Sequence, residues 1–144
     1  MIKKLFYLFF PLVLGSIVGI LVNGSIDYNT LVKPPLSPPG IIFPIMWSIL
    51  YLLMGISYYI YRKYNNDNLI YYAQLFVNLL WTIIFFTLKL RLFGLIWIIL
   101  LLVLIIIMYK RFNKYNKLSS YLLIPYIIWV VFATYLTIGI NILN

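Results

Sequence analysis

The chain alternates between long apolar runs and short polar clusters. Charged residues divide it into five apolar windows, and each window has about the 20 mostly apolar residues that a helix needs to cross a bilayer. The windows lack the inside–outside alternation of a transmembrane barrel. The pattern predicts an all-α integral membrane bundle of five transmembrane helices in a single domain over residues 1–144. The expected helices are Phe6–Asn23, Phe43–Tyr61, Leu69–Leu88, Leu92–Tyr109 and Leu118–Asn141.

The composition supports a membrane protein and excludes several kinds of chemistry. Hydrophobic residues make up 65% of the 144 positions and charged residues 9%, whereas soluble domains have roughly 45–50% and about 25%. The chain has no cysteine and no histidine, and its acidic residues are Asp27 and Asp67. Disulfides, thiolate chemistry and the usual haem ligands are therefore excluded, a paired-carboxylate mechanism is disfavoured, and no metal site is expected.

The formal net charge of +9 does not indicate nucleic-acid binding, because the cations lie in short clusters between apolar runs. They fit orientation in the membrane and attraction to anionic lipids. Their distribution predicts a cytoplasmic N-terminus and an external C-terminus, and the start of the chain favours a prokaryotic cell membrane. One side holds Lys3, Lys4, Arg62, Lys63, Lys110, Arg111, Lys114 and Lys117, and the other holds Lys33, Lys89 and Arg91.

The connection over residues 24–42 contains four prolines, including Pro38 and Pro39. Proline fixes φ and removes a donor, so this segment should be a stiff, non-helical lid over a pocket between helices. The short link between the third and fourth helices predicts antiparallel neighbours. The fourth helix, almost wholly Leu, Ile and Val, is expected to be a lipid-facing wall. Gly15 and Gly19 form a GxxxG pattern, which allows close helix approach within a subunit or in a homodimer.

Three helices place aromatic and polar residues on one face. One interpretation is a packed aromatic seam with interhelical hydrogen bonds; the other is an apolar pocket whose polar groups orient a ligand. Spacing alone leaves both open. The faces carry Trp47, Tyr51, Met54 and Tyr58 on the second helix, Gln74, Asn78, Trp81 and Phe85 on the third, and Tyr126, Trp129 and Ala133 on the fifth.

Three ordered segments resemble a known family. They are YNTLVKPPLSPPGIIFPIMWSILYLLMGISY from Tyr28, QLFVNLLWTIIFF from Gln74 and LLIPYIIWVVFATYL from Leu122. The chain resembles the translocator proteins, also called tryptophan-rich sensory proteins or peripheral benzodiazepine receptors. Two positions depart from the family pattern, because Asp27 and Leu36 stand where the pattern has tryptophan.

The resemblance implies a five-helix bundle with a ligand pocket at its first-loop end. Family members bind porphyrins, and several bind cholesterol or benzodiazepine-type drugs. We therefore expect a receptor or sensor that takes porphyrins and similar flat apolar ligands and requires no cofactor. Free-base porphyrin should bind about as well as haem. The expected ligand-binding residues are Lys33, Pro38, Pro39, Trp47, Tyr51, Asn78, Trp81, Tyr126, Trp129 and Ala133.

The resemblance also implies an alternative, which is light- and oxygen-dependent degradation of protoporphyrin with Trp47 and Trp129 as the reactive residues. Facilitated porphyrin transport is another alternative. Proton-coupled transport is disfavoured, since it usually needs an ionisable group inside the membrane and both aspartates fall in predicted loops. A role as a scaffold or regulatory partner is a further alternative.

Overall fold

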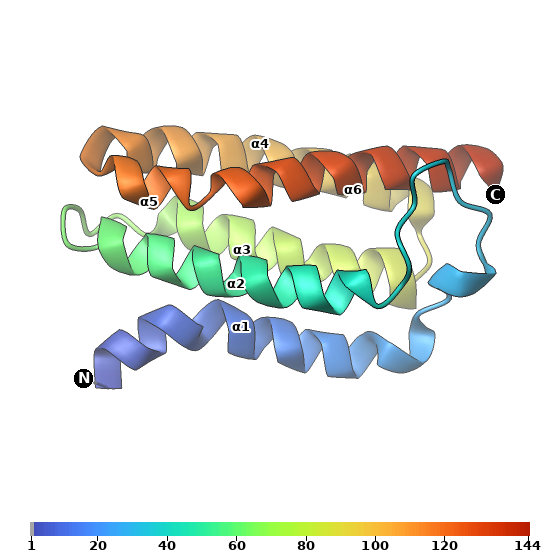
Figure 1. Cartoon of the computed structure of the whole chain (residues 1–144), viewed down its shortest axis with the longest axis horizontal. Coiled ribbons are helices and arrows are strands. Elements are labelled where there is room, and N and C mark those ends of the chain that lie inside the picture. The colour runs from blue at the N-terminus through green and yellow to red at the C-terminus, as the bar shows by residue number, and fades with distance from the viewer. Residues whose placement is uncertain (1) are drawn as a thin grey trace.

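The computed structural model describes residues 2–144 and confirms the five apolar helices long enough to span a membrane (Figure 1). The fifth span consists of two helices, and two short 3-10 turns lie in the first connection. The elements are α1 Ile2–Val22, η1 Asn23–Ser25, η2 Tyr28–Thr30, α2 Ile42–Tyr61, α3 Leu69–Thr82, the π-helical turn η3 Ile83–Thr87, α4 Arg91–Tyr115, α5 Lys117–Tyr121 and α6 Ile124–Leu143.

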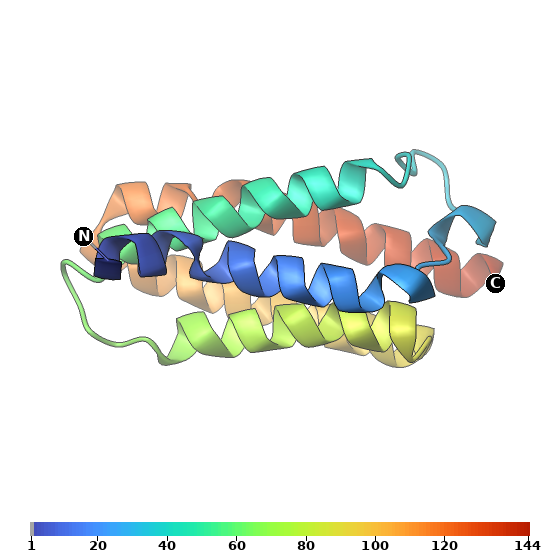
Figure 2. The ribbon, with the colours of Figure 1, turned by 90° about the horizontal axis from the view of Figure 1, so that it is seen from below.

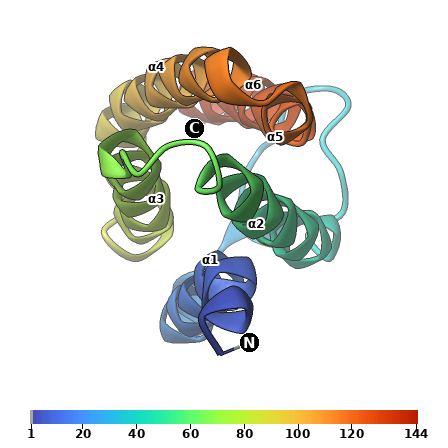
Figure 3. The same ribbon diagram turned by 90° about the vertical axis from the view of Figure 1, so that its left-hand side faces the viewer.

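The spans run roughly along one axis, and seen end-on they form a ring (Figures 2 and 3). Helix α1 contacts α2 and α3, α3 contacts α4, and α4 contacts α5 and α6, which close the ring against α2. The predicted pairing of α3 with α4 is confirmed. The connection from α1 to α2 crosses the end of the bundle beside the C-terminus of α6 (Figure 1).

Helix α4 has one buried and one exposed face, so the expected lipid-facing wall describes only its exposed face. Its residues Ile98, Leu101, Ile105 and Met108 are fully buried, and only the opposite face is exposed. The spacing of three and four residues puts the buried set on one face. Because both faces are equally apolar, the sequence carries no periodic signal that would reveal this.

Helix α1 lies very close to α2 at Gly55. A Cβ atom at this position would meet the backbone carbonyl of Leu8 on α1, so only glycine allows this approach. Further along α1, Gly15 faces the ring of Tyr51, and Gly19 has no neighbour for an added Cβ within 4 Å. The space between α1 and its neighbours therefore widens toward the end that carries the first connection.

The break in the fifth span and the turns between spans have identifiable local features. The side chain of Asn116 caps α5 by accepting from the N–H of Ser119 at 3.0 Å. The last span is interrupted at residues 122–123, and Pro125 lies in the first turn of α6, where its missing N–H is tolerated. After η3 the chain turns through Lys89, whose φ of 54° lies in the left-handed region, and enters α4.

Candidate functional site

A cavity of about 740 Å³ opens at the end of the bundle beneath the first connection. Its walls come from the second half of α1, the first half of α2, the end of α3 with η3, and α6, and residues of the connection cover it. This position fits the divergence of α1 from its neighbours. The volume lies within the roughly 300–1,000 Å³ typical of small-molecule pockets.

Aromatic rings form much of the cavity wall. Trp47 and Trp129 meet edge to face at 89°, with ring centroids 6.3 Å apart. Trp47 also lies nearly parallel to Tyr51, and Phe43 contacts the edge of Trp129. On the opposite side Trp81 stacks on Phe85 with centroids 5.1 Å apart. These rings offer both faces and edges to a flat apolar molecule.

Two cavity tryptophans differ in whether the indole N–H has a hydrogen-bond acceptor. Trp81 donates to the carbonyl of Gly94 at 3.1 Å, which fixes its ring against α4. Trp129 is 8% exposed, and within residues 2–144 its Nε1 has no hydrogen-bond acceptor. The nitrogen itself is buried in the cavity wall, so a ligand reaches this N–H only when the ring turns, and a buried donor without an acceptor is costly.

A buried hydrogen-bond network lies behind the aromatic wall and joins α2, α3 and α6. Tyr51 donates to Asn78 Oδ1 at 2.5 Å, and Asn78 donates to the hydroxyl of Tyr126 at 2.6 Å. That hydroxyl donates to Gln74 at 2.8 Å, and Gln74 donates to the carbonyl of Tyr71 at 2.9 Å. Tyr51 alone of these residues lines the cavity, so the network holds that ring in place.

The structure brings half of the expected ligand-binding residues to the cavity. Trp47, Tyr51, Trp81, Trp129 and Ala133 line it. Asn78 and Tyr126 belong instead to the network behind it.

Three further expected residues, Lys33, Pro38 and Pro39, lie in the covering connection and are absent from the cavity lining. The ammonium of Lys33 donates to the carbonyls of Tyr28 and Leu31 and lies 4.7 Å from the centroid of the Tyr28 ring.

Sequence reasoning missed the contribution of α1 to the cavity. Leu12, Gly15 and Gly19 line it, together with Phe43 and Phe85 from other elements. The GxxxG pattern marked this face of α1 in the sequence, but we interpreted it as a sign of helix packing alone. Phe85, which lies in η3, was placed on the correct face of the predicted third helix and was not carried into the predicted site.

The covering connection is held by contacts at several points. The buried Tyr28 hydroxyl donates to the Pro38 carbonyl at 2.8 Å. Burial raises the pKa of this hydroxyl above its ordinary value, although a hydrogen bond with Ser37 acts in the opposite direction. Tyr135 of α6 donates to the Pro35 carbonyl at 2.6 Å.

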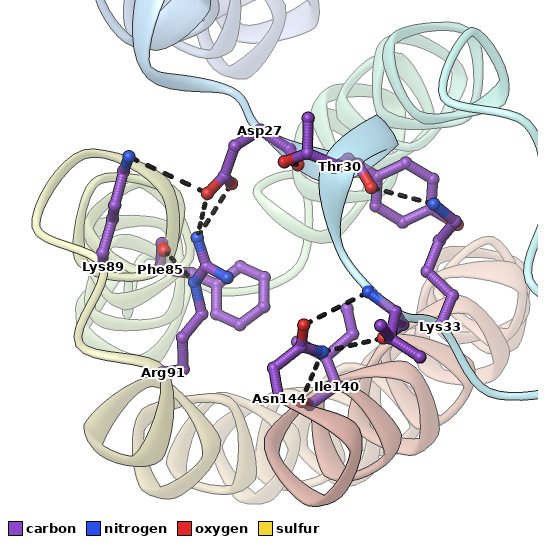
Figure 4. Close-up of polar contacts among 10 residues, drawn as sticks. Asp27, Thr30, Lys33, Phe85, Lys89, Arg91, Ile140 and Asn144 are labelled. Atoms are coloured by element: carbon purple, nitrogen blue, oxygen red, sulfur yellow. Dashed lines mark hydrogen bonds and ion pairs between the residues drawn. The ribbon is translucent and has the colours of Figure 1, made fainter.

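A further contact involves the last residue. Asn144 donates to the Val32 carbonyl at 2.8 Å and accepts from the Val32 N–H at 3.2 Å (Figure 4). The connection therefore follows the end of α6 closely.

Comparison with known proteins agrees with this architecture. A model of the TspO/MBR family matches residues 7–143. The chain is 37% identical to the tryptophan-rich protein TspO of Chlorobaculum tepidum, covering 81% of this chain and 78% of that protein. It is 37% identical to the tryptophan-rich protein TspO of Archaeoglobus fulgidus (81% and 79%) and 30% identical to a tryptophan-rich sensory protein of Cereibacter sphaeroides (81% and 75%). With its five membrane-spanning helices, the chain belongs to the TspO/MBR family of integral membrane proteins.

Proposed function

We propose that this protein is a membrane receptor or sensor that binds porphyrins and similar flat, apolar ligands in the cavity beneath the first connection. The observation that carries the proposal is the aromatic wall, which leaves about 740 Å³ open and contains the N–H of Trp129, a donor without an acceptor within residues 2–144. Names of relatives such as the tryptophan-rich sensory protein of Cereibacter sphaeroides support a sensory role.

The chemistry of the wall suits a tetrapyrrole. Trp47 and Trp81 provide apolar faces on two sides of the cavity, and Trp129 adds a third ring whose N–H is buried and has no acceptor within residues 2–144. A porphyrin ring has a large apolar surface that these rings can cover, and polar groups at its rim toward which the Trp129 N–H can turn. Because no histidine or cysteine exists in the chain, we expect affinity to come from the ring rather than from iron ligation.

A titration tests this proposal. Purified protein in detergent is titrated in the dark with protoporphyrin IX and with haem, and tryptophan fluorescence and the porphyrin absorption band are recorded. We expect saturable quenching with similar affinities for the two ligands. Absence of saturable binding would contradict the proposed function, and much tighter binding of haem would contradict recognition through the ring.

A second function is favoured by the geometry of two tryptophans. Trp47 and Trp129 both line the cavity, with ring centroids 6.3 Å apart. Light excites a bound porphyrin, the excited ring takes one electron from a nearby indole and passes it to molecular oxygen, and the indole radical cation then takes an electron from the porphyrin, so that the macrocycle is oxidised by one electron and oxygen is reduced to superoxide. The protein would then direct oxidative breakdown of protoporphyrin.

Illumination in air distinguishes the two functions. If the protein degrades porphyrin, loss of the absorption band should be faster with protein than without it, and Trp47→Phe and Trp129→Phe should slow it. Trp97→Phe is the matched control, because Trp97 donates to the Val77 carbonyl at 2.8 Å and lies outside the cavity lining. Equal rates in all variants would leave binding without degradation.

A further inference from the structure

An ion-pair cluster fastens the first connection to the start of α4. Asp27 accepts from Arg91 Nη2 through both carboxylate oxygens, at 2.8 and 2.9 Å (Figure 4). Lys89 lies 3.8 Å from the same carboxylate. The Arg91 side chain is 15% exposed, so this pair is better shielded from water than the exposed pair of Arg111 and Asp67 at the other end of the bundle.

Arg91 is held in place by groups that border the cavity. Its Nε donates to the Phe85 carbonyl at 2.9 Å, and its guanidinium carbon lies 4.8 Å from the centroid of the Phe85 ring. Phe85 lines the cavity, and so does Ile26, the residue before Asp27. The Arg91 carbonyl accepts from Asn141 at 3.0 Å. The guanidinium is therefore oriented in advance against Phe85, a residue of the cavity wall, while Arg91 itself lies outside the lining.

Positive side chains exceed negative ones at this end of the bundle. Within residues 2–144, the loop end carries Lys33, Lys89 and Arg91 against Asp27. Neither Lys33 nor Arg91 lines the cavity, but Lys33 donates to backbone carbonyls whereas Arg91 already holds a carboxylate through two hydrogen bonds, so Arg91 is the cation arranged for a carboxylate.

We propose that Arg91 recognises a carboxylate of the ligand and that Asp27 occupies it as an internal competitor when no acidic ligand is bound. This assignment rests on the proposed function of the cavity. A carboxylate on the rim of a porphyrin replaces Asp27 on the guanidinium and makes the same charge-assisted hydrogen bonds. Asp27 is left with Lys89, and the first connection loses its link to α4. Binding of an acidic ligand and release of the covering connection are thereby coupled.

The test compares two ligands that differ in the carboxylates alone, protoporphyrin IX and its dimethyl ester. Asp27→Asn removes the competing charge and preserves the side-chain volume. We expect it to tighten binding of the acid by about three- to tenfold and to change binding of the ester by less than about twofold. Arg91→Gln should weaken binding of the acid by a similar factor and spare the ester.

The double variant and a matched pair complete the design. If the gain from Asp27→Asn depends on Arg91, the variant with both substitutions should bind the acid no better than Arg91→Gln alone. Asp67→Asn and Arg111→Gln, which remove the ion pair at the far end of the bundle, should leave both affinities unchanged. The gain expected for Asp27→Asn cannot result from misfolding, so it decides the question even if Arg91→Gln folds poorly.

Two results would count against the account, and they are distinguishable. If the wild-type protein binds both porphyrins but Asp27→Asn and Arg91→Gln shift the acid and the ester by equal factors, Arg91 only fastens the connection and the assignment is wrong. If the wild-type protein binds neither porphyrin, the proposed function itself fails, and the assignment fails with it.

Discussion

At the loop end of the bundle, Trp47 and Trp129 meet at right angles with centroids 6.3 Å apart and border a cavity. At the opposite end, Tyr58 lies parallel to Tyr71 with centroids 3.8 Å apart, and Tyr61 lies on Phe112 at 3.9 Å. Both ends are rich in aromatic residues. The second end fills its space with closely stacked rings, whereas the two tryptophans of the first border open space.

Helix α1 contributes to this difference. Gly55 lets it contact α2 through the Leu8 backbone, whereas no atom lies within 4 Å of a Cβ built at Gly19. The polar groups differ as well. Tyr51, on the cavity side, makes a hydrogen bond in the network, whereas within residues 2–144 the Tyr71 hydroxyl has no partner. The number of aromatic residues therefore does not distinguish the cavity end from the opposite end. The distances between the ring centroids do.

The largest expected effect is on stability at the stacked end. Phe112→Ala removes a fully buried ring, and because packing drives helix association in a bilayer we expect it to lower the free energy of unfolding by about 3–5 kcal/mol. Phe43→Ala, at the partly open cavity wall, should cost about 1–2 kcal/mol. Unfolding in detergent measures both, and equal losses would contradict the contrast between the ends.

Glycine substitutions test the divergence of α1. Gly55→Ala places a Cβ against the Leu8 carbonyl, a backbone group that cannot rotate away, and should destabilise by about 1–3 kcal/mol. Gly19→Ala meets no neighbour and should be nearly neutral. If Gly55→Ala were as stable as the wild-type protein, the close contact between α1 and α2 would be refuted.

The same substitution should have different effects in the two regions. Tyr51→Phe leaves Asn78 Oδ1 without its donor and should cost about 0.6–2 kcal/mol. Tyr71→Phe removes a hydroxyl that has no partner within residues 2–144 and should be neutral or stabilising. Paired thermal unfolding curves decide this, and a larger loss for Tyr71→Phe would contradict the assigned network.

The smallest expected effect is on affinity. Trp129→Phe retains most of the apolar surface but removes the N–H, which we expect to turn toward the polar rim of a bound porphyrin, and it should weaken binding by about 1 kcal/mol, or roughly fivefold. Trp97→Phe should leave affinity unchanged, because Trp97 already donates to Val77 and lies outside the cavity lining. Equal binding by the two variants would remove the role assigned to this donor.

Much of the fold could be predicted because charged residues are excluded from the bilayer interior and therefore mark the ends of the spans. The faces of α2, α3 and α6 could also be predicted, since Trp47, Asn78 and Trp129 contrast with their apolar neighbours. The buried face of α4 could not, because Ile98 and Leu101 differ in no such way from the exposed residues around them.

The charged end of the site escaped prediction for another reason. Asp27 and Arg91 are 64 positions apart, and no helical or strand periodicity relates them. The structure alone brings them together. The separation of Asn78 from the cavity surface was also hidden, because spacing places a residue on a face and does not give its depth.

The central claim is that ligand binds in the open space at the loop end, and two glycines test it most directly. A Cβ added at Gly19 or at Gly24 meets no atom within 4 Å, but Gly19 lines the cavity and Gly24 does not. The measurement is the dissociation constant for protoporphyrin IX of Gly19→Leu, Gly24→Leu and the wild-type protein. We predict that Gly19→Leu, by filling the cavity, weakens binding about tenfold or more, and that Gly24→Leu stays within about twofold. Wild-type affinity in Gly19→Leu would show that the ligand binds elsewhere.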